Sequence, residues 1–249
     1  MMRITETVKQ LIIINIIFFV GSFVVGDAAI NILAMHFPIS PDFKVWQIIT
    51  HMFMHGSIMH ILFNMFALFS FGGLLEQLWG PKKFIFFYIS CGLGAVALHI
   101  GINYIQIYNC LEILETSGLS KGAVIEALNA KNFEMLVNKS DVSTVQTLAE
   151  IYFTPMLGAS GAVYGLLVAF AFMFPNAELM LMFIPVPIKA KYFVPALLAY
   201  DLFFGLKGQS IFGGGDDGIA HFAHLGGALI GFIMMWYWKK NAFNNNRWN

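Results

Sequence analysis

Charged residues are scarce in this chain of 249 residues. Asp, Glu, Lys and Arg make up 11% of it, whereas a soluble domain typically carries about 25%. Hydrophobic residues make up 58%, and the mean hydropathy is +0.72. With 14 basic and 14 acidic residues the formal net charge is zero, so the chain lacks the basic excess typical of a nucleic-acid partner. The composition excludes an ordinary soluble domain and indicates a polytopic membrane protein.

Cysteine is also scarce. Cys91 and Cys110 are the two cysteines of the chain, and in one continuous helix they would lie about 28 Å apart. A disulfide joins residues whose Cα atoms are roughly 4 to 7 Å apart. We therefore expect no disulfide between them.

Apolar runs extend from one end of the chain to the other with a single long polar interruption. Each run is near the ~20 residues that cross ~30 Å of hydrocarbon. We therefore predict one all-α membrane domain over residues 1–249, with six transmembrane helices. An extracytoplasmic insertion at 106–155 separates the third helix from the fourth, and its role stays open between a tolerated loop and a gating or partner-binding cap. The predicted spans are about 11–34, 56–76, 84–106, 158–175, 190–206 and 219–238.

The distribution of Lys and Arg predicts the orientation, because cytoplasmic connections carry an excess of them. A cytoplasmic N-terminus puts nine basic residues inside and five outside, over much longer segments. We therefore expect both termini in the cytoplasm, in a bacterial inner or cell membrane. The inner set is Arg3, Lys9, Lys82, Lys83, Lys189, Lys191, Lys239, Lys240 and Arg247, and the outer set is Lys44, Lys121, Lys131, Lys139 and Lys207.

The fourth apolar run begins with the motif Gly158-Ala159-Ser160-Gly161. A serine among small residues is typical of close helix packing, and the alternative is a nucleophilic hydroxyl. The motif differs from the G-x-S-x-G elbow of soluble hydrolases, because Ala162 stands at its last position and no strand is expected before it.

A histidine lies in the last run. His224 precedes Gly227 and Gly231, whose spacing forms a small-residue face. Gly161 and Gly165 form a similar face on the fourth run, so contact between the faces would bring Ser160 to His224. An intramembrane histidine marks a functional site by default, although a hydrogen-bonded structural histidine is the alternative. His221 competes as the base, and we favour His224 because of its spacing to Gly227.

A third group enters the second run. His60 and Asn64 are four residues apart and project from one helix face. An imidazole and an amide aimed at one point suit stabilisation of an oxyanion, and polar contacts between helices are the alternative. His51 and His55 could instead bind zinc, but no glutamate completes an H-E-x-x-H motif. We predict no metal site and no cofactor.

Tyr164 lies four residues after Ser160 on the same face. It is expected to stack on His224 or to pack in the core. Glu76 and Asp201 are interpreted as structural, and Asp216 and Asp217 belong to a Gly-rich surface loop, so no carboxylate is assigned to His224.

Together these motifs resemble the rhomboid family of intramembrane serine proteases. The resemblance rests on the Ser160 motif, on His224 with Gly227 and Gly231, on His55, His60 and Asn64, and on Tyr164. It covers about residues 11–238. Gln47 follows Trp46 where many rhomboids have Trp-Arg, and the insertion is longer than in the simplest members.

The resemblance implies a catalytic dyad of Ser160 as nucleophile and His224 as general base and then acid. Asn64, His60 and the Ser160 backbone N–H would hold the oxyanion, with Tyr164, Gly158, Gly161, Gly227 and Gly231 in support. Substrates would be single-span membrane proteins, cut in the lipid bilayer near its extracytoplasmic face. The alternatives are a polytopic transporter and a non-catalytic rhomboid-like binder of membrane proteins, although the latter would be expected to lack Ser160 or His224.

Overall fold

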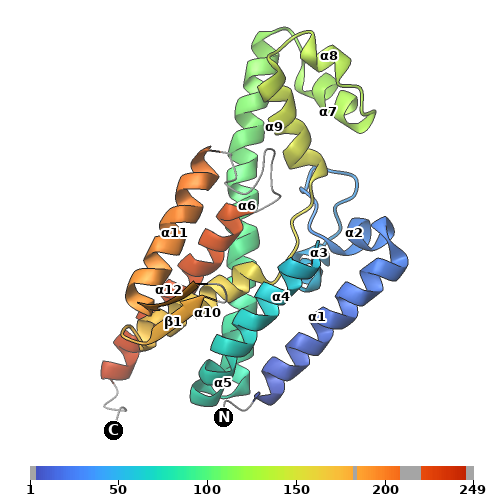
Figure 1. Ribbon diagram of the computed structural model, residues 1–249. Coiled ribbons are helices and arrows are strands. Elements are labelled where there is room, and N and C mark those ends of the chain that lie inside the picture. The colour runs from blue at the N-terminus through green and yellow to red at the C-terminus, as the bar shows by residue number, and fades with distance from the viewer. Residues whose placement is uncertain (1–3, 182–183, 208–219, 245–249) are drawn as a thin grey trace.

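The computed structural model describes residues 4–181, 184–207 and 220–244, and these are mainly helical (Figure 1). Two short turns interrupt the helices, a 3₁₀ turn η1 (His51–Phe53) and a π-helical turn η2 (Leu68–Gly72). The helices are α1 (Glu6–Val25), α2 (Asp27–Leu33), α3 (Gln47–Thr50), α4 (Ile58–Ala67), α5 (Gly73–Trp79), α6 (Pro81–Thr116), α7 (Lys121–Asn129), α8 (Glu134–Val137), α9 (Val142–Phe153), α10 (Ser160–Met173), α11 (Ala190–Lys207) and α12 (His221–Asn244).

Three of the described helical segments are long and apolar enough to cross a membrane: Glu6–Val25, Ile58–Trp79 and Pro81–Thr116. In the most apolar 18-residue stretch of α1, only 17% of the residues are buried, although the mean hydropathy is 2.2. Most of its apolar side chains therefore face outward, as contact with lipid requires. Helices also occupy the fourth, fifth and sixth predicted runs, as α10, α11 and α12. The integral membrane character is thus supported, and the count of six spans stays a prediction.

Several element boundaries differ from the prediction. The first run is not one helix, because α1 ends at Val25 and is followed by Gly26, whose φ of 69° suits glycine, before α2 begins at Asp27. Helix α6 continues to Thr116, so its 36 residues reach about 54 Å and carry the start of the insertion away from the predicted membrane. The connection between the fourth and fifth predicted spans contains a hairpin, although an all-α chain was predicted.

This hairpin pairs β1 (Glu178–Leu181) with β2 (Ile184–Lys189) in antiparallel register, with Glu178 opposite Lys189. Pro185 and Pro187 exclude a helix there, and the β-branched residues that alternate with them, Ile184, Val186 and Ile188, favour an extended chain. The all-α prediction is therefore wrong for this connection.

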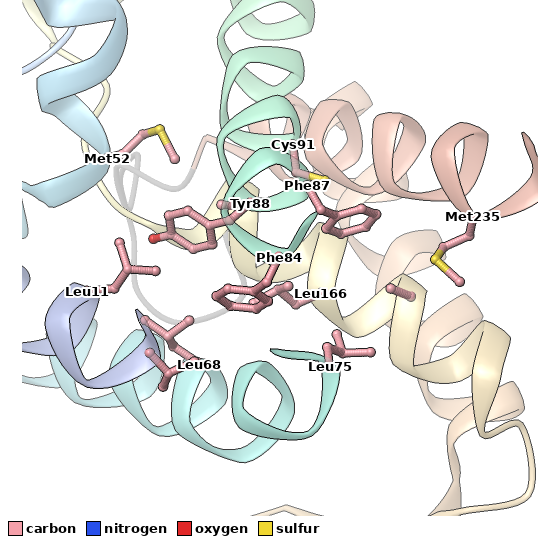
Figure 2. Packing of buried hydrophobic residues seen from close by; sticks show 13 residues of the cluster. Leu11, Met52, Leu68, Leu75, Phe84, Phe87, Tyr88, Cys91, Leu166 and Met235 are labelled. Carbon is pink, nitrogen blue, oxygen red and sulfur yellow. The ribbon is translucent and has the colours of Figure 1, made fainter. Parts of the chain in front are cut away.

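The membrane core is built around α6. Figure 2 shows Phe84, Phe87, Tyr88 and Cys91 of α6 packed among side chains from α1, η1, η2, α5, α10 and α12. Helix α6 packs most extensively against α12 and then against α10. This arrangement places α10, which carries Ser160, inside the molecule with helices on several sides.

The insertion has a second core of its own, formed by the outer part of α6 with α7, α8 and α9. Leu114, Val124, Leu136 and Leu148 lie at its centre and are fully buried. Hydrogen bonds from Ser143 and Thr144 to the Asp141 carboxylate cap α9 and lower the pKa of Asp141 to about 2. Figure 1 places this folded insertion at the end of the molecule opposite the start of α1 and the end of α12.

Gln47 organises the connection between α2 and α3. Its side chain is fully buried, and its Oε1 accepts hydrogen bonds from the backbone N–H groups of Lys44 (3.0 Å) and His36 (3.3 Å). Its Nε2 donates to the carbonyls of Asn31 and Asp42, each at 3.0 Å. The glutamine that departs from the Trp-Arg pattern thus ties several backbone segments of the connection between α2 and α3 together.

Glu76 is structural, as expected. Its carboxylate accepts hydrogen bonds from the backbone N–H groups of Thr7 (3.1 Å) and Val8 (3.0 Å), and from the Thr5 hydroxyl. These donors lie at the start of α1, where unpaired N–H groups favour a negative charge. Glu76 therefore fastens the start of the first helix to α5.

Candidate active site

Ser160 is the first residue of α10. The backbone reaches it through Gly158, whose φ of 125° is rare for residues with a side chain. A Cβ at Gly158 would lie 2.7 Å from His60 Nε2, and the Gly158 N–H donates to the His51 carbonyl at 2.9 Å. The glycine thus allows the turn that brings the serine close to His60 and His51.

His224 of α12 lies against this serine. Its Nε2 is 2.9 Å from Ser160 Oγ, and 13% of its side chain is exposed. A hydroxyl within hydrogen-bond distance of an imidazole is the arrangement of an activated nucleophile beside its base.

The small-residue faces of α10 and α12 meet, as the sequence predicts. A Cβ on Gly227 would overlap the Gly161 carbonyl oxygen, and a Cβ on Gly231 would lie 2.9 Å from the Gly165 Cα. Small residues let helix backbones approach this closely, and the contact sets the distance between Ser160 and His224.

Tyr164 stacks on His224. The ring centroids are 4.2 Å apart and the planes are inclined by 12°. Since Tyr164 follows Ser160 by one helical turn, α10 supplies both the hydroxyl at the edge of the imidazole and the aromatic ring on its face. The stacking that was expected is present, and its role in catalysis stays a prediction.

His60 and Asn64 line the cavity that contains Ser160 and His224. The cavity has a volume of about 920 Å³, and His51 also contributes to its wall. Asn64 is buried, and its Nδ2 donates to the His60 carbonyl at 3.1 Å.

His55, which belongs to the same sequence motif as His60 and Asn64, does not line this cavity. It is buried behind His60, with 5.0 Å between the two ring centroids. Its ring therefore packs against the cavity wall formed by His60 rather than forming that wall.

The site also contains a carboxylate, which the sequence motifs did not indicate. Asp201 of α11 is 1% exposed, and its Oδ1 lies 3.0 Å from His224 Nδ1 and 2.7 Å from His221 Nδ1. His221, the competing base, thus pairs with Asp201, while His224 pairs with both Asp201 and Ser160. Asp216 and Asp217 lie outside the described residues.

Among the described residues, one group of three could offer metal ligands from close range. Ligand atoms of Asp201, His221 and His224 lie within 4.8 Å of one another. Hydrogen bonds between these side chains account for their proximity. His51 and His55, the pair considered for zinc in the sequence, do not belong to this group.

Comparison with known proteins finds similarity to rhomboid proteins. The family model of the Rhomboid domain matches residues 42–241. The chain is 27% identical over 194 residues to the mitochondrial Rhomboid protein 1 of Saccharomyces cerevisiae, covering 78% of this chain and 42% of that protein. It is 26% identical over 217 residues to an uncharacterised mitochondrial rhomboid protein of Schizosaccharomyces pombe, covering 79% of this chain and 52% of that protein.

A shorter segment of this chain is similar to a bacterial protein. The chain is 37% identical over 71 residues to the rhomboid protease GlpG of Salmonella paratyphi A, covering 28% of this chain and 26% of that protein. The chain therefore spans about half the length, or less, of these curated relatives.

Proposed function

Since this chain belongs to the rhomboid family, we propose that it is a serine endopeptidase that cleaves membrane proteins within the bilayer. The observation that carries the proposal is the 2.9 Å contact between Ser160 Oγ and His224 Nε2 in a cavity bounded by membrane helices. We propose Ser160 as the nucleophile and His224 as the base.

The chemistry follows from this geometry. His224 Nε2 takes the Ser160 proton while Oγ attacks the carbonyl carbon of the substrate peptide. The protonated imidazole then gives its proton to the leaving amine, and an acyl group remains on Ser160. Water, activated by the same nitrogen, hydrolyses that ester and restores the hydroxyl. The proton thus shuttles through one nitrogen of His224.

Three donors could stabilise the oxyanion of the tetrahedral intermediate. The first N–H groups of a helix have no partner inside it, so the Ser160 amide can donate. Asn64 and His60 line the same cavity as Ser160. Donors fixed at the place where charge develops favour the transition state over the ground state.

The substrate is proposed to be a single-span membrane protein cut near the extracytoplasmic face. The cavity wall includes apolar side chains from α4, α10 and α11, among them Phe63, Leu167, Phe193 and Leu197. Such a wall accommodates an extended apolar segment that has left its helix. Because α11 contributes to the wall, its displacement is the proposed entry route.

The location is proposed as a cell membrane with both termini in the cytoplasm. The start of α1 and the end of α12 lie at the same end of the molecule in Figure 1, as this topology requires. The relatives include mitochondrial yeast proteins and bacterial proteins, so the bacterial membrane stays a prediction.

The test is cleavage in reconstituted vesicles. The chain is inserted with a single-span reporter protein and treated in parallel with a fluorophosphonate, and we expect one cut near the outer end of the reporter helix and covalent labelling of Ser160. The Ser22→Ala variant, which alters a serine of α1, should behave like the unmodified chain. A solute transporter would instead show uptake into vesicles that survives Ser160→Ala, and this result with no cleavage would refute the proposal.

Replacing Asn64 tests the oxyanion site. We expect Asn64→Leu to lower kcat by ~10² to 10³, with little change in KM, because one donor to the transition state is lost. The matched control is Asn15→Leu, since Asn15 is a buried asparagine of α1 whose Nδ2 donates to the Leu11 carbonyl in the same i to i−4 pattern. Equal losses of kcat in the two variants would contradict the assignment.

A further inference from the structure

Asp201 is a carboxylate buried in a helix of a membrane protein. Such a group is costly unless hydrogen bonds and opposite charge compensate for its lost hydration. Its partners among the described residues include the two imidazoles of α12, and both approach the same oxygen, at 2.7 Å from His221 and 3.0 Å from His224. The carboxylate thus lies directly behind the base of the proposed dyad.

We propose that Asp201 is a positioning residue that holds His224 in the tautomer and orientation needed to activate Ser160. This inference rests on the proposed function and extends its Ser–His dyad to a Ser–His–Asp triad. Asp201 does not touch the reacting atoms, and it acts through the imidazole.

The distances on the two sides of the ring decide the tautomer. His224 Nδ1 lies 3.0 Å from Asp201 Oδ1, and Nε2 lies 2.9 Å from Ser160 Oγ. A neutral imidazole has one N–H, and an ionised carboxylate can only accept. The proton of His224 must then sit on Nδ1, which leaves the lone pair of Nε2 to accept the Ser160 hydroxyl.

Neighbouring groups limit the movement of the Asp201 and His224 side chains. His221 donates to the same Asp201 oxygen from one turn earlier on α12, and Tyr164 stacks on the face of the His224 ring. The carboxylate is therefore held by two N–H donors, and the His224 ring is fixed at both edges and on one face. When His224 becomes protonated during the attack, the adjacent carboxylate stabilises the new charge.

The variant Asp201→Asn tests the proposal, because an amide of the same shape can donate to Nδ1 and select the unproductive tautomer. We expect kcat to fall by ~10² or more, while KM and the thermal unfolding temperature change little. The control is Leu202→Ala, since the neighbouring Leu202 of α11 is half exposed and should keep the original kcat. A kcat for Asp201→Asn within twofold of the unmodified chain would overturn the proposal.

A second measurement needs no Asp201 variant and so stands even if Asp201→Asn does not fold. Nitrogen-15 NMR of the chain labelled at histidine, with His224 assigned by its replacement, distinguishes the two neutral tautomers. A proton on Nδ1 is expected, and a proton on Nε2 would overturn the proposal.

Ser160→Ala separates the two hypotheses. If that variant still cleaves the reporter, the proposed protease function itself fails. If it is inactive while Asp201→Asn retains the full kcat, only the positioning role fails.

Discussion

The Ser160→Ala protein is expected to cleave a membrane-protein reporter at least ~10⁴-fold more slowly than the unmodified chain. The substitution removes the only atom that bonds to the substrate carbonyl in the proposed mechanism, and it leaves the cavity and the donors around it in place. Alanine is small and favours helices, so α10 should still begin at residue 160. The measurement is the rate of reporter cleavage in vesicles, together with the extent of fluorophosphonate labelling.

His224→Ala should lose about as much activity, and the double variant little more than either single one, because a nucleophile and its base act as a unit. His221→Ala is the informative comparison, since His221 contacts Asp201 at 2.7 Å and Ser160 pairs with His224 instead. We expect the smaller loss from His221→Ala. Near-complete loss there with an active His224→Ala protein would reverse the choice of base.

The contact between Ser160 and His224 could be predicted because glycine spacing carries geometric information. Gly161 and Gly227 sit at fixed offsets from the serine and the histidine, and small residues indicate where two membrane helices approach. Once these faces meet, the positions of both side chains follow from helix geometry. The structure shows this contact between α10 and α12.

The position of Asp201 beside His224 was not predicted, although a glycine near it in the sequence marks the approach of its helix to α12. Gly205 follows Asp201 by four residues on the same face of α11, and a Cβ there would lie 3.2 Å from the His221 Cβ. The glycine therefore marks where α11 approaches α12, as Gly227 marks the approach of α10. A lone glycine without a second small residue at the matching spacing is a weaker pattern, and a buried membrane carboxylate was read as structural rather than as functional.

The remaining differences concern where elements begin and end. Hydropathy predicts spans from the thickness of the bilayer, so it could not show that α6 continues to Thr116 to support the insertion. The break at Gly26 lies within a run that is apolar on average, and Asp27 and Asn31 after it are too few to end that run by hydropathy. Local backbone geometry decides such boundaries, and apolar content alone does not report it.

Gly227→Ala is expected to destabilise the protein by several kcal/mol, at the upper end of the range for single substitutions. The added methyl would overlap the Gly161 carbonyl oxygen, which belongs to the backbone of the opposing helix and cannot rotate away as a side chain could. Relief of the overlap requires α10 and α12 to separate. Since Ser160 and His224 lie on these two helices, we expect loss of cleavage as well, because a displacement of about 1 Å can cost ~10² in rate.

A graded series separates this steric effect from the general effect of replacing glycine in a helix. A Cβ at Gly101 of α6 would meet nothing within 4 Å, whereas one at Gly231 would lie 2.9 Å from the Gly165 Cα. Gly101→Ala should therefore be neutral or stabilise the helix by up to ~1 kcal/mol, and Gly231→Ala should fall between it and Gly227→Ala. Thermal unfolding in detergent micelles and cleavage rates are measured for all three variants. Equal stability of the Gly227→Ala and Gly101→Ala proteins would mean that the close contact between α10 and α12 does not position the serine beside its base.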